Sequence, residues 1–152
     1  MKYLAPLFVL TLAACASSPE SKTNSIQYSS TMDIIYSAAQ ARPNPVTGNY
    51  VLPVRATGSQ GPVVYLNTEL DYRDPRAVTI AIHPHLVQEL AGRHGENPET
   101  FFVGKTVQVR GQAQTVRINF NCESHTEQKY YYQTHIPIVE SRQIRIVADS
   151  IE

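Results

Sequence analysis

The sequence predicts a mainly β domain in which one small sheet closes on itself. Residues 107–113 give the clearest sign, because their apolar and polar side chains alternate as in a strand with one solvated face. Shorter segments of strand character lie on both sides, and one helical pattern precedes this strand. The order is therefore three strands, a helix and two strands. A five-stranded Greek-key barrel of the OB type has this order, with its helix between the third and fourth strands.

A short helix is expected before the barrel, over residues 31–41. Ile34 and Ala38 recur at helical spacing, and Asp33 lies near the start, where a carboxylate suits the helix dipole. The prolines within residues 42–45 should end this helix, because proline and the residue before it resist the α conformation.

The first three strands are predicted over residues 50–56, 63–68 and 77–82. Pro53 weakens the first of them, because proline has no amide hydrogen to donate to a sheet. The glycines and the proline within residues 58–62 predict the turn that leads to the second strand.

The helix of the barrel is predicted over residues 85–91, where apolar side chains follow at spacings of three and four. Pro84 suits its first turn and Gly92 suits its C-cap. Residues 94–99 are expected to form a loop.

The fourth strand is expected over residues 105–118, with Gly111 as a point where it could bend or bulge. Polar residues 119–129 predict a hairpin connection to a strand over residues 130–139. Residues 143–147 would continue that strand or pair with it.

Five segments resemble small bacterial OB-fold domains, in which a Tyr-Leu-Asn strand precedes a polar loop and Gly-Lys-x-Val-x-Val-x-Gly opens the fourth strand. The matching segments are residues 64–68, 71–74, 78–82, 104–111 and 143–146. The likeness covers residues 45–147 and implies the OB fold. Many such domains are uncharacterised envelope proteins, so the resemblance implies no particular ligand.

The N-terminus has the character of an export signal. Lys2 precedes an apolar run over residues 4–12, which is shorter than the roughly 20 residues that span a bilayer. Residues 1–14 therefore fit a signal peptide. The ending Leu-Ala-Ala-Cys at Cys15 resembles the lipobox of bacterial lipoproteins, which implies diacylglyceryl transfer to the Cys15 thiol, cleavage before it and acylation, with palmitate, of the new amino terminus. An ordinary signal peptide with a chance cysteine is the alternative.

The resemblance to lipoproteins also implies a location. Ala16 stands where an aspartate would favour the inner membrane under enterobacterial sorting rules, so the outer membrane is expected, with the protein facing the periplasm. Several acyl chains give stable anchoring. Residues 15–31 are rich in serine and threonine and predict a lipidated tether. Residues 32–152 then form a single OB-like domain with its core in residues 45–147.

The composition of the chain limits the classes of function that it can have. The chain has 13 basic and 13 acidic residues, and loss of Lys2 with the leader leaves 12 basic ones. Such a balance argues against a dedicated nucleic-acid binder, which is normally basic. Cys122 is left alone beside Cys15, and it is read either as a small buried residue or as a thiol that is reactive or pairs between molecules.

The outer face of the barrel is the first candidate binding surface. If Val64 and Leu66 face the core, Tyr65 and Asn67 face outward. Outward positions on later strands include Arg110 and Arg145, and an aromatic ring beside arginines and amides could stack on a base or sugar and hold a phosphate. A plain solvated sheet face is the alternative.

The tyrosine-rich segment 130–135 is the second candidate. Tyr131, Gln133 and His135 would share one face of a strand. They form either a patch that stacks on a ligand or docks a partner, or ordinary strand packing, which aromatic residues also favour.

Metal and catalytic chemistry have little support in the sequence. His83 and His85 could bind a metal, but no third ligand is near them in sequence. Asp71 and Asp74 are explained by turn chemistry more simply than by an acid pair or calcium. Known catalytic motifs are absent, so neither an enzyme nor a cofactor is expected.

These observations predict a non-enzymatic, membrane-anchored envelope lipoprotein whose OB-like barrel binds another envelope protein. The alternative is an OB module that binds a nucleic acid or an oligosaccharide. The two differ in salt dependence, because binding to nucleic acid falls steeply with salt.

Overall fold

A computed structural model describes residues 27, 28, 30–119 and 129–148 of the chain. The expected signal peptide, the lipidated Cys15, most of the tether, most of the hairpin connection expected over residues 119–129 and Cys122 lie outside the described residues. The elements are, in chain order, β1 Gln27–Tyr28, α1 Thr31–Ala41, β2 Val46–Pro53, β3 Ala56–Gln60, β4 Val63–Asn67, β5 Val78–Ile82, α2 Pro84–His94, α3 Pro98–Phe101, β6 Thr106–Asn119, β7 Tyr130–Ile138, η1 Ser141–Gln143 and β8 Ile144–Ala148.

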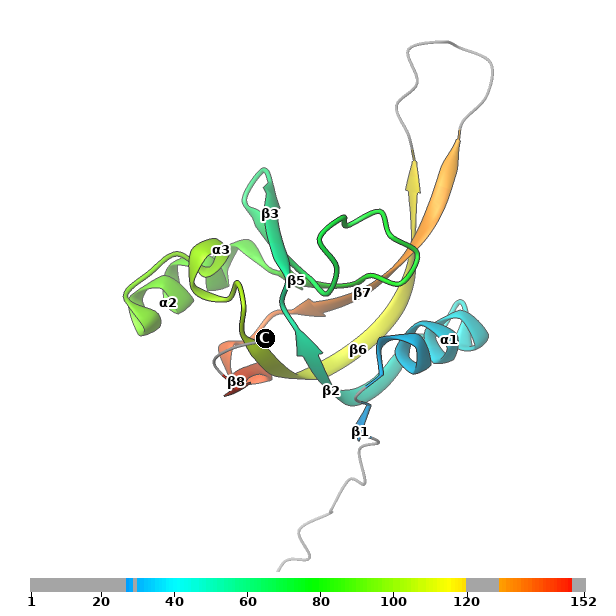
Figure 1. The fold of residues 1–152 in the computed structure, drawn as a ribbon, viewed down its shortest axis with the longest axis horizontal. Coiled ribbons are helices and arrows are strands. Elements are labelled where there is room, and N and C mark those ends of the chain that lie inside the picture. Colours follow the sequence, from blue (N-terminus) through cyan, green and yellow to red (C-terminus); the bar gives the residue numbers. More distant parts are fainter. Residues whose placement is uncertain (1–26, 29, 120–128, 149–152) are drawn as a thin grey trace, which may run out of the picture.

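The strands form one strongly curved sheet in the order β1-β2-β6-β7-β5-β4-β3, and β8 pairs with the first part of β6 (Figure 1). β3 ends this order and β2 lies next to its other end, yet the two strands follow each other in the chain with only Val54 and Arg55 between them. The amide of Val54 donates to the carbonyl of Lys105, and the amide of Arg55 donates to that of Asn67. These two residues therefore connect the strand pair β2–β6 to the strand pair β3–β4.

β6 is the longest strand and takes part in both halves of the sheet. Its residues 106–113 pair with β2, and its residues 114–119 pair with β7. A β carbon on Gly111 would lie 3.1 Å from Cγ2 of the buried Ile136. The absence of a side chain at Gly111 thus lets β7 approach β6 just before the change of partner, near the bend predicted from the sequence.

The core fills the space inside the curved sheet and is closed by helices on opposite sides. α1 buries Ile34 and Ala38, and α2 buries Leu86 and Leu90. In Figure 1, α2 and α3 lie together on the left and α1 lies on the right, with the sheet between them. Among the described residues, no helix is long and apolar enough to span a membrane.

Most predicted elements are confirmed to within two residues. The helix over residues 31–41 has the predicted bounds, because Ser30 accepts a hydrogen bond from the amide of Asp33 and caps it. The strands β4, β5, β6 and β7 also match their predicted segments. The described part of the chain is mainly β, as expected. The sheet is not the closed barrel that was predicted, because its end strands β1 and β3 do not pair with each other among the described residues.

Three details of the prediction are wrong. The expected single strand over residues 50–56 is two strands, β2 and β3, and the described residues hold eight strands where five were predicted. The turn expected over residues 58–62 is narrower, because β3 runs on to Gln60 and only Gly61 adopts positive φ. Short strands of mixed polarity, such as β3, give no alternation that sequence reading could detect.

The helix after β5 also extends further than predicted. Gly92 lies inside α2, and Gly95 ends it with φ of 74° and an amide hydrogen bond to the carbonyl of Ala91. The loop expected over residues 94–99 contains the start of α3, where Asn97 accepts a hydrogen bond from the amide of Glu99. Proline at the first position of this helix is a start signal that the loop prediction overlooked.

Candidate functional site

A groove of about 530 Å³ lies over the outer faces of β4, β5 and β7, with the β3–β4 hairpin along one side. This volume falls within the range of small-ligand sites. Two strands, β4 and β7, and the loop between β4 and β5 supply most of its aromatic and amide side chains: Tyr65, Asn67, Tyr72, Tyr131, Gln133 and His135.

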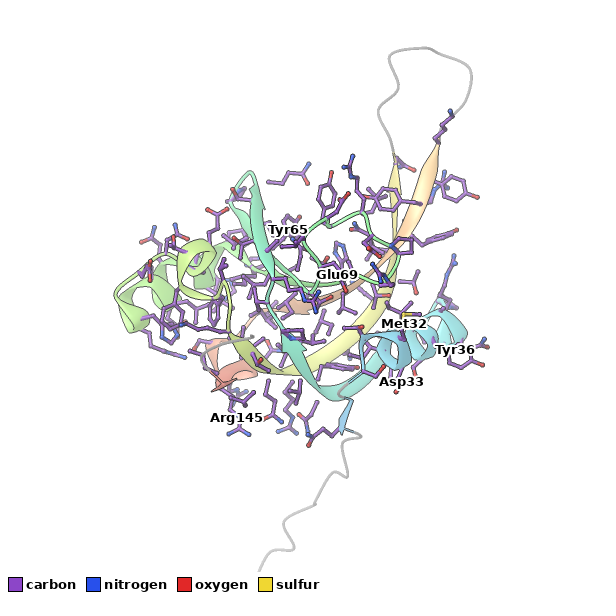
Figure 2. All side chains as sticks on the ribbon, in the orientation of Figure 1. Met32, Asp33, Tyr36, Tyr65, Glu69 and Arg145 are labelled. Carbon is purple, nitrogen blue, oxygen red and sulfur yellow. The ribbon has the colours of Figure 1, made fainter. Side chains whose placement is uncertain are left out.

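Strand alternation places these side chains on the outer face. Val64 and Leu66 are buried in the core, so Tyr65 points away from it, next to its register partner Gly58 of β3 (Figure 2). The register then lines up Asn67 with Thr79 of β5 and Thr79 with His135 of β7. The hydroxyl of Thr79 donates to Oδ1 of Asn67 at 2.9 Å, and the rings of Tyr65 and His135 lie 6.1 Å apart.

A chain of hydrogen bonds fixes the β7 side of the groove. Gln133 Nε2 donates to the carbonyl of Tyr72 at 2.6 Å and to the hydroxyl of Tyr131 at 3.2 Å. Nε2 of His135 bonds to Oε1 of the same glutamine at 2.9 Å. Gln133 is buried, so its bonds tie the loop between β4 and β5 to β7 and hold the groove in shape.

The groove carries no formal charge on the side chains that line it. None of its described lining residues is Asp, Glu, Lys or Arg. Burial lowers the pKa of His135 from its ordinary value of 6.5, so the imidazole is neutral at pH 7. Burial also raises the pKa of Tyr131, which keeps its phenol protonated.

Charged groups in the adjoining loop are already paired. Arg73 bonds Asp71 at 3.1 Å and Arg76 bonds Asp74 at 2.7 Å. Hydrogen bonds from these arginines lower the pKa of Asp71 and lower that of Asp74 to about 2. Each aspartate also accepts the amide of the residue two positions ahead, which confirms the predicted turn chemistry.

The structure divides the predicted site residues into two groups. Tyr65, Asn67, Tyr131 and His135 meet in the groove. Arg110 and Arg145 do not. β6 residue 110 pairs with β2, and Arg145 on β8 donates to Oε1 of Gln108 at 2.7 Å.

The groove also contains residues that sequence reading did not single out as ligand contacts. Tyr72 lies in the polar loop that was read only as a turn, and Leu70 is beside it in the groove. A tyrosine flanked by two turn-forming aspartates gives no periodic signal. The buried glutamine on β7 was placed on the correct face, but its bond to this loop could not be foreseen.

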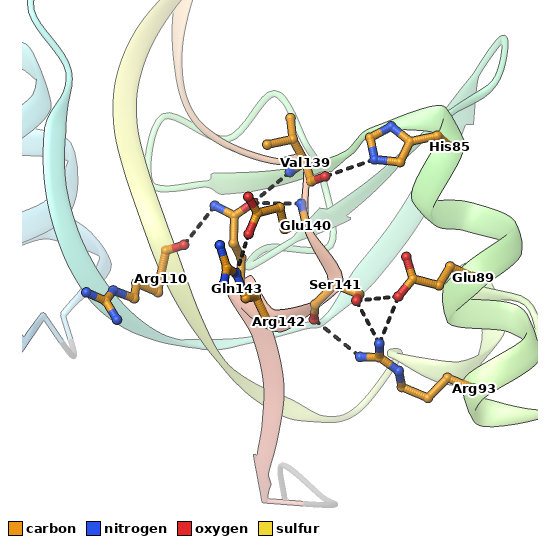
Figure 3. A network of polar contacts seen from close by, with 9 residues as sticks. All are labelled: His85, Glu89, Arg93, Arg110, Val139, Glu140, Ser141, Arg142 and Gln143. Atoms are coloured by element: carbon orange, nitrogen blue, oxygen red, sulfur yellow. Dashed lines mark hydrogen bonds and ion pairs between the residues drawn. The ribbon is translucent and has the colours of Figure 1, made fainter.

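The two histidines considered as metal ligands contact each other. Nδ1 of His83 and Nδ1 of His85 are 2.6 Å apart, and Nε2 of His85 bonds the carbonyl of Val139 at 2.9 Å. Within the described ranges, no group of three or more metal-ligating side chains is present. His85 thus joins the start of α2 to the residue that follows β7 (Figure 3).

Further polar contacts fasten the chain after β7 to α2 and β6 (Figure 3). Arg93 of α2 bonds Glu89 at 2.9 Å and the hydroxyl of Ser141 at 2.7 Å. Gln143 accepts the amides of Val139 and Glu140 and donates to the carbonyl of Arg110 at 3.0 Å. This network positions β8 against β6, at a distance from the groove.

No protein-family model matches the chain, and no curated protein matches it. Solved structures similar to it include an aspartyl-tRNA synthetase from Entamoeba histolytica, with a TM-score of 0.51 and 13% identity over 99% of this chain and 29% of that chain. A putative aspartyl-tRNA synthetase from Leishmania major Friedlin has a TM-score of 0.44 and 14% identity over 91% of this chain and 24% of that chain. The chain thus spans less than a third of either protein. The Entamoeba likeness, together with the strand order, fits an OB-type fold.

Proposed function

We propose that this chain is a non-enzymatic, lipid-anchored envelope protein whose OB-type module binds a short uncharged oligosaccharide in the groove. The observation that carries the proposal is a concave site lined by tyrosines and amides with no charged side chain among its described lining residues. The anchor is inferred from the lipobox at Cys15.

We infer that the curved sheet corresponds to the five strands of an OB-type fold, with β1 and β8 as additional strands. β2 and β3 count as one strand bent at Val54 and Arg55, followed by β4, β5, β6 and β7, with α2 between β5 and β6. In this arrangement, β4 and β5 are the second and third strands. OB folds bind oligonucleotides and oligosaccharides on the face of those two strands and the neighbouring loops, which is where the groove lies.

The lining groups suit a sugar chain. The ring of Tyr65 offers an apolar face for the C–H side of a pyranose. The Tyr65 hydroxyl has no hydrogen-bond partner among the described residues and is available to a sugar hydroxyl, whereas Asn67 is only 6% exposed at the floor of the groove. The bond from Thr79 holds Oδ1 of Asn67 in place, which reduces the ordering cost of binding.

The absence of charge separates this ligand from a nucleic acid. Phosphate contacts dominate nucleic-acid affinity and need lysine or arginine. The arginines of the adjoining loop, Arg73 and Arg76, are each held by an aspartate. The likeness to a tRNA synthetase concerns the fold alone, so it does not change this preference.

The concave shape of the groove also favours an oligosaccharide as the ligand over the protein partner that was expected from the sequence. Stable protein interfaces bury about 800 Å² on each partner and use a broad surface. The tyrosine that was expected to dock a protein, Tyr131, is instead bonded through its hydroxyl to Gln133 and lines the concave groove.

The proposal is tested by calorimetric titration of the full chain in detergent with chitotetraose, a neutral oligosaccharide, and with a single-stranded oligothymidylate. Tyr65→Ala should weaken chitotetraose binding about tenfold, because it removes a central aromatic contact. Tyr36→Ala is the matched control, because Tyr36 is 67% exposed on α1 and lies away from the groove (Figure 2). Chitotetraose affinity should be unchanged between 50 and 500 mM salt.

Two results would overturn this function. If both variants bound chitotetraose with equal affinity, the sugar would not bind in the groove. Oligothymidylate binding that is lost in Tyr65→Ala and falls with salt would favour the nucleic-acid alternative.

A further inference from the structure

A second set of aromatic side chains lies in a row with two arginines at the end of the β6–β7 hairpin. The guanidinium carbon of Arg42 lies 4.1 Å from the ring centre of Tyr132, and that of Arg117 lies 4.2 Å from the ring centre of Tyr130. The two rings are 5.6 Å apart and meet edge to face. We call these four residues the Arg-Tyr row.

The Arg-Tyr row and the groove use opposite faces of β7. Tyr131 and His135 line the groove, and side chains alternate along a strand, so Tyr130 and Tyr132 point the other way. Arg117 is the register partner of Tyr132 and therefore shares its face. A ligand on the row would leave the groove open.

The charge of the row is not neutralised within the described part of the chain. Neither Arg42 nor Arg117 forms an ion pair there, in contrast to the arginines of the β4–β5 loop. Lys129, next to Tyr130, is exposed and also outside the ion pairs of the described residues. Two cations of the row, with Lys129 next to them in sequence, thus lie at the paired ends of β6 and β7.

The packing of the row favours a phosphate group over a nucleic-acid base. Each tyrosine ring has one face covered by a guanidinium, which leaves less ring face open for base stacking. Each guanidinium lies over a ring and forms no ion pair with another described residue, so its N–H groups remain available for a bidentate contact with phosphate oxygens. The rings themselves stay 50% exposed at Tyr130 and 43% exposed at Tyr132.

We propose that the Arg-Tyr row binds the phosphates of anionic lipid headgroups at a bilayer surface. Half-exposed tyrosines beside cations are the residues that settle at the boundary between lipid and water. Figure 1 shows the paired ends of β6 and β7 extending beyond the body of the domain, where a flat surface could reach them. This site is independent of the oligosaccharide proposed for the groove.

The covalent chain permits this contact when Cys15 is anchored. α1 begins at Thr31, and Arg42 caps its C-terminus. Pairing of β1 with β2 fixes the chain at Gln27, so the 12 residues from Cys15 to Gln27 span at most about 40 Å when fully extended. The anchor therefore keeps the row within reach of the same membrane.

The test measures how the full-length Cys15→Ala chain partitions onto vesicles, so that no acyl chain contributes. One set of vesicles contains equal phosphatidylglycerol and phosphatidylcholine, and the other contains phosphatidylcholine alone. The double variant Arg42→Gln/Arg117→Gln should bind the anionic vesicles about 25-fold more weakly than the parent, at about fivefold for each cation. Binding to phosphatidylcholine should not change, so any contribution of the N-terminal segment cancels.

The matched control is Arg110→Gln/Arg145→Gln, which removes the same charge from arginines that also lack an ion pair among the described residues. It should lose less than threefold. An equal loss in both variants would mean general charge attraction and would overturn the proposal. Row-dependent binding of oligothymidylate or free inorganic phosphate in place of the anionic vesicles would overturn it as well.

Circular dichroism shows whether each variant folds, and Arg117→Gln alone replaces the double variant if that one does not. Chitotetraose titration of the row variant distinguishes the two proposals. An unchanged affinity leaves the groove proposal standing whatever the vesicles show.

Discussion

His135 occupies the groove as a neutral imidazole whose Nε2 bonds Oε1 of the buried Gln133. Its pKa is lowered by burial, whereas an unfolded chain gives it a value near 6.5. The unfolded state therefore binds more protons than the folded state as pH falls below about 6.5. By linkage, the free energy of unfolding decreases over that range until the folded pKa is passed.

We predict that His135→Gln reduces this acid sensitivity. Urea unfolding at pH 7.5, 6 and 5 should show that the parent loses more stability than the variant as pH falls. The pKa of His94 is also lowered by burial, but His94 is present in both proteins and cancels in the comparison. Identical pH dependence in the two proteins would contradict the prediction.

At the scale of elements, two glycines show how the same residue type can be misread. The sequence placed a C-cap at Gly92, but α2 continues through it for another two residues to His94. A glycine with positive φ was needed at the end, and Gly95 supplies it. One-sided apolar spacing located the helix, whereas its end depended on which of two nearby glycines adopts the left-handed conformation.

Substitutions at Gly92 and Gly111 are predicted to have opposite effects. A β carbon at Gly92 meets nothing within 4 Å, so Gly92→Ala should raise the free energy of unfolding by about 1 kcal/mol through helix propensity. A β carbon at Gly111 meets the buried Ile136 at 3.1 Å, so Gly111→Ala should lower it by about 1–3 kcal/mol. Urea unfolding of the two variants measures both effects. Equal changes in the same direction would contradict the packing argument.

At the scale of the whole molecule, the sequence predicted the order of elements and the faces of the strands better than their partners. Period-two alternation predicted that Tyr65 points away from the core and that Tyr131 and His135 share one face of their strand, and these residues meet in the groove. It could not show that β6 changes partner between Ala113 and Gln114. Arg110 lies before that point and pairs with β2, whereas Gln114 lies after it and pairs with His135. Arg110 therefore lies outside the groove, although it is only four residues along β6 from the first residue that pairs with β7.

The topology also predicts slow folding. β5 and β7 pair in parallel with Val78 opposite Thr134, and β2 pairs with β6 with Val46 opposite Ala113. Both pairings join residues that are far apart in the chain, and the entropy of closing such loops is lost before the contacts form. Stopped-flow refolding from urea should give a main phase in milliseconds to seconds. Completion in microseconds would contradict this expectation.

Because β6 belongs to both halves of the sheet, it couples the unfolding of one half to the unfolding of the other. One continuous backbone segment, Thr106–Asn119, belongs to both halves of the sheet, and Val54 and Arg55 join the halves a second time. The molecule therefore has no seam along which one half could open while the other stays intact. Destabilising substitutions beside β8 and beside the groove should therefore lower the free energy of the same single unfolding transition. A ligand bound at one end should raise the free energy of unfolding of the whole domain, including the opposite end.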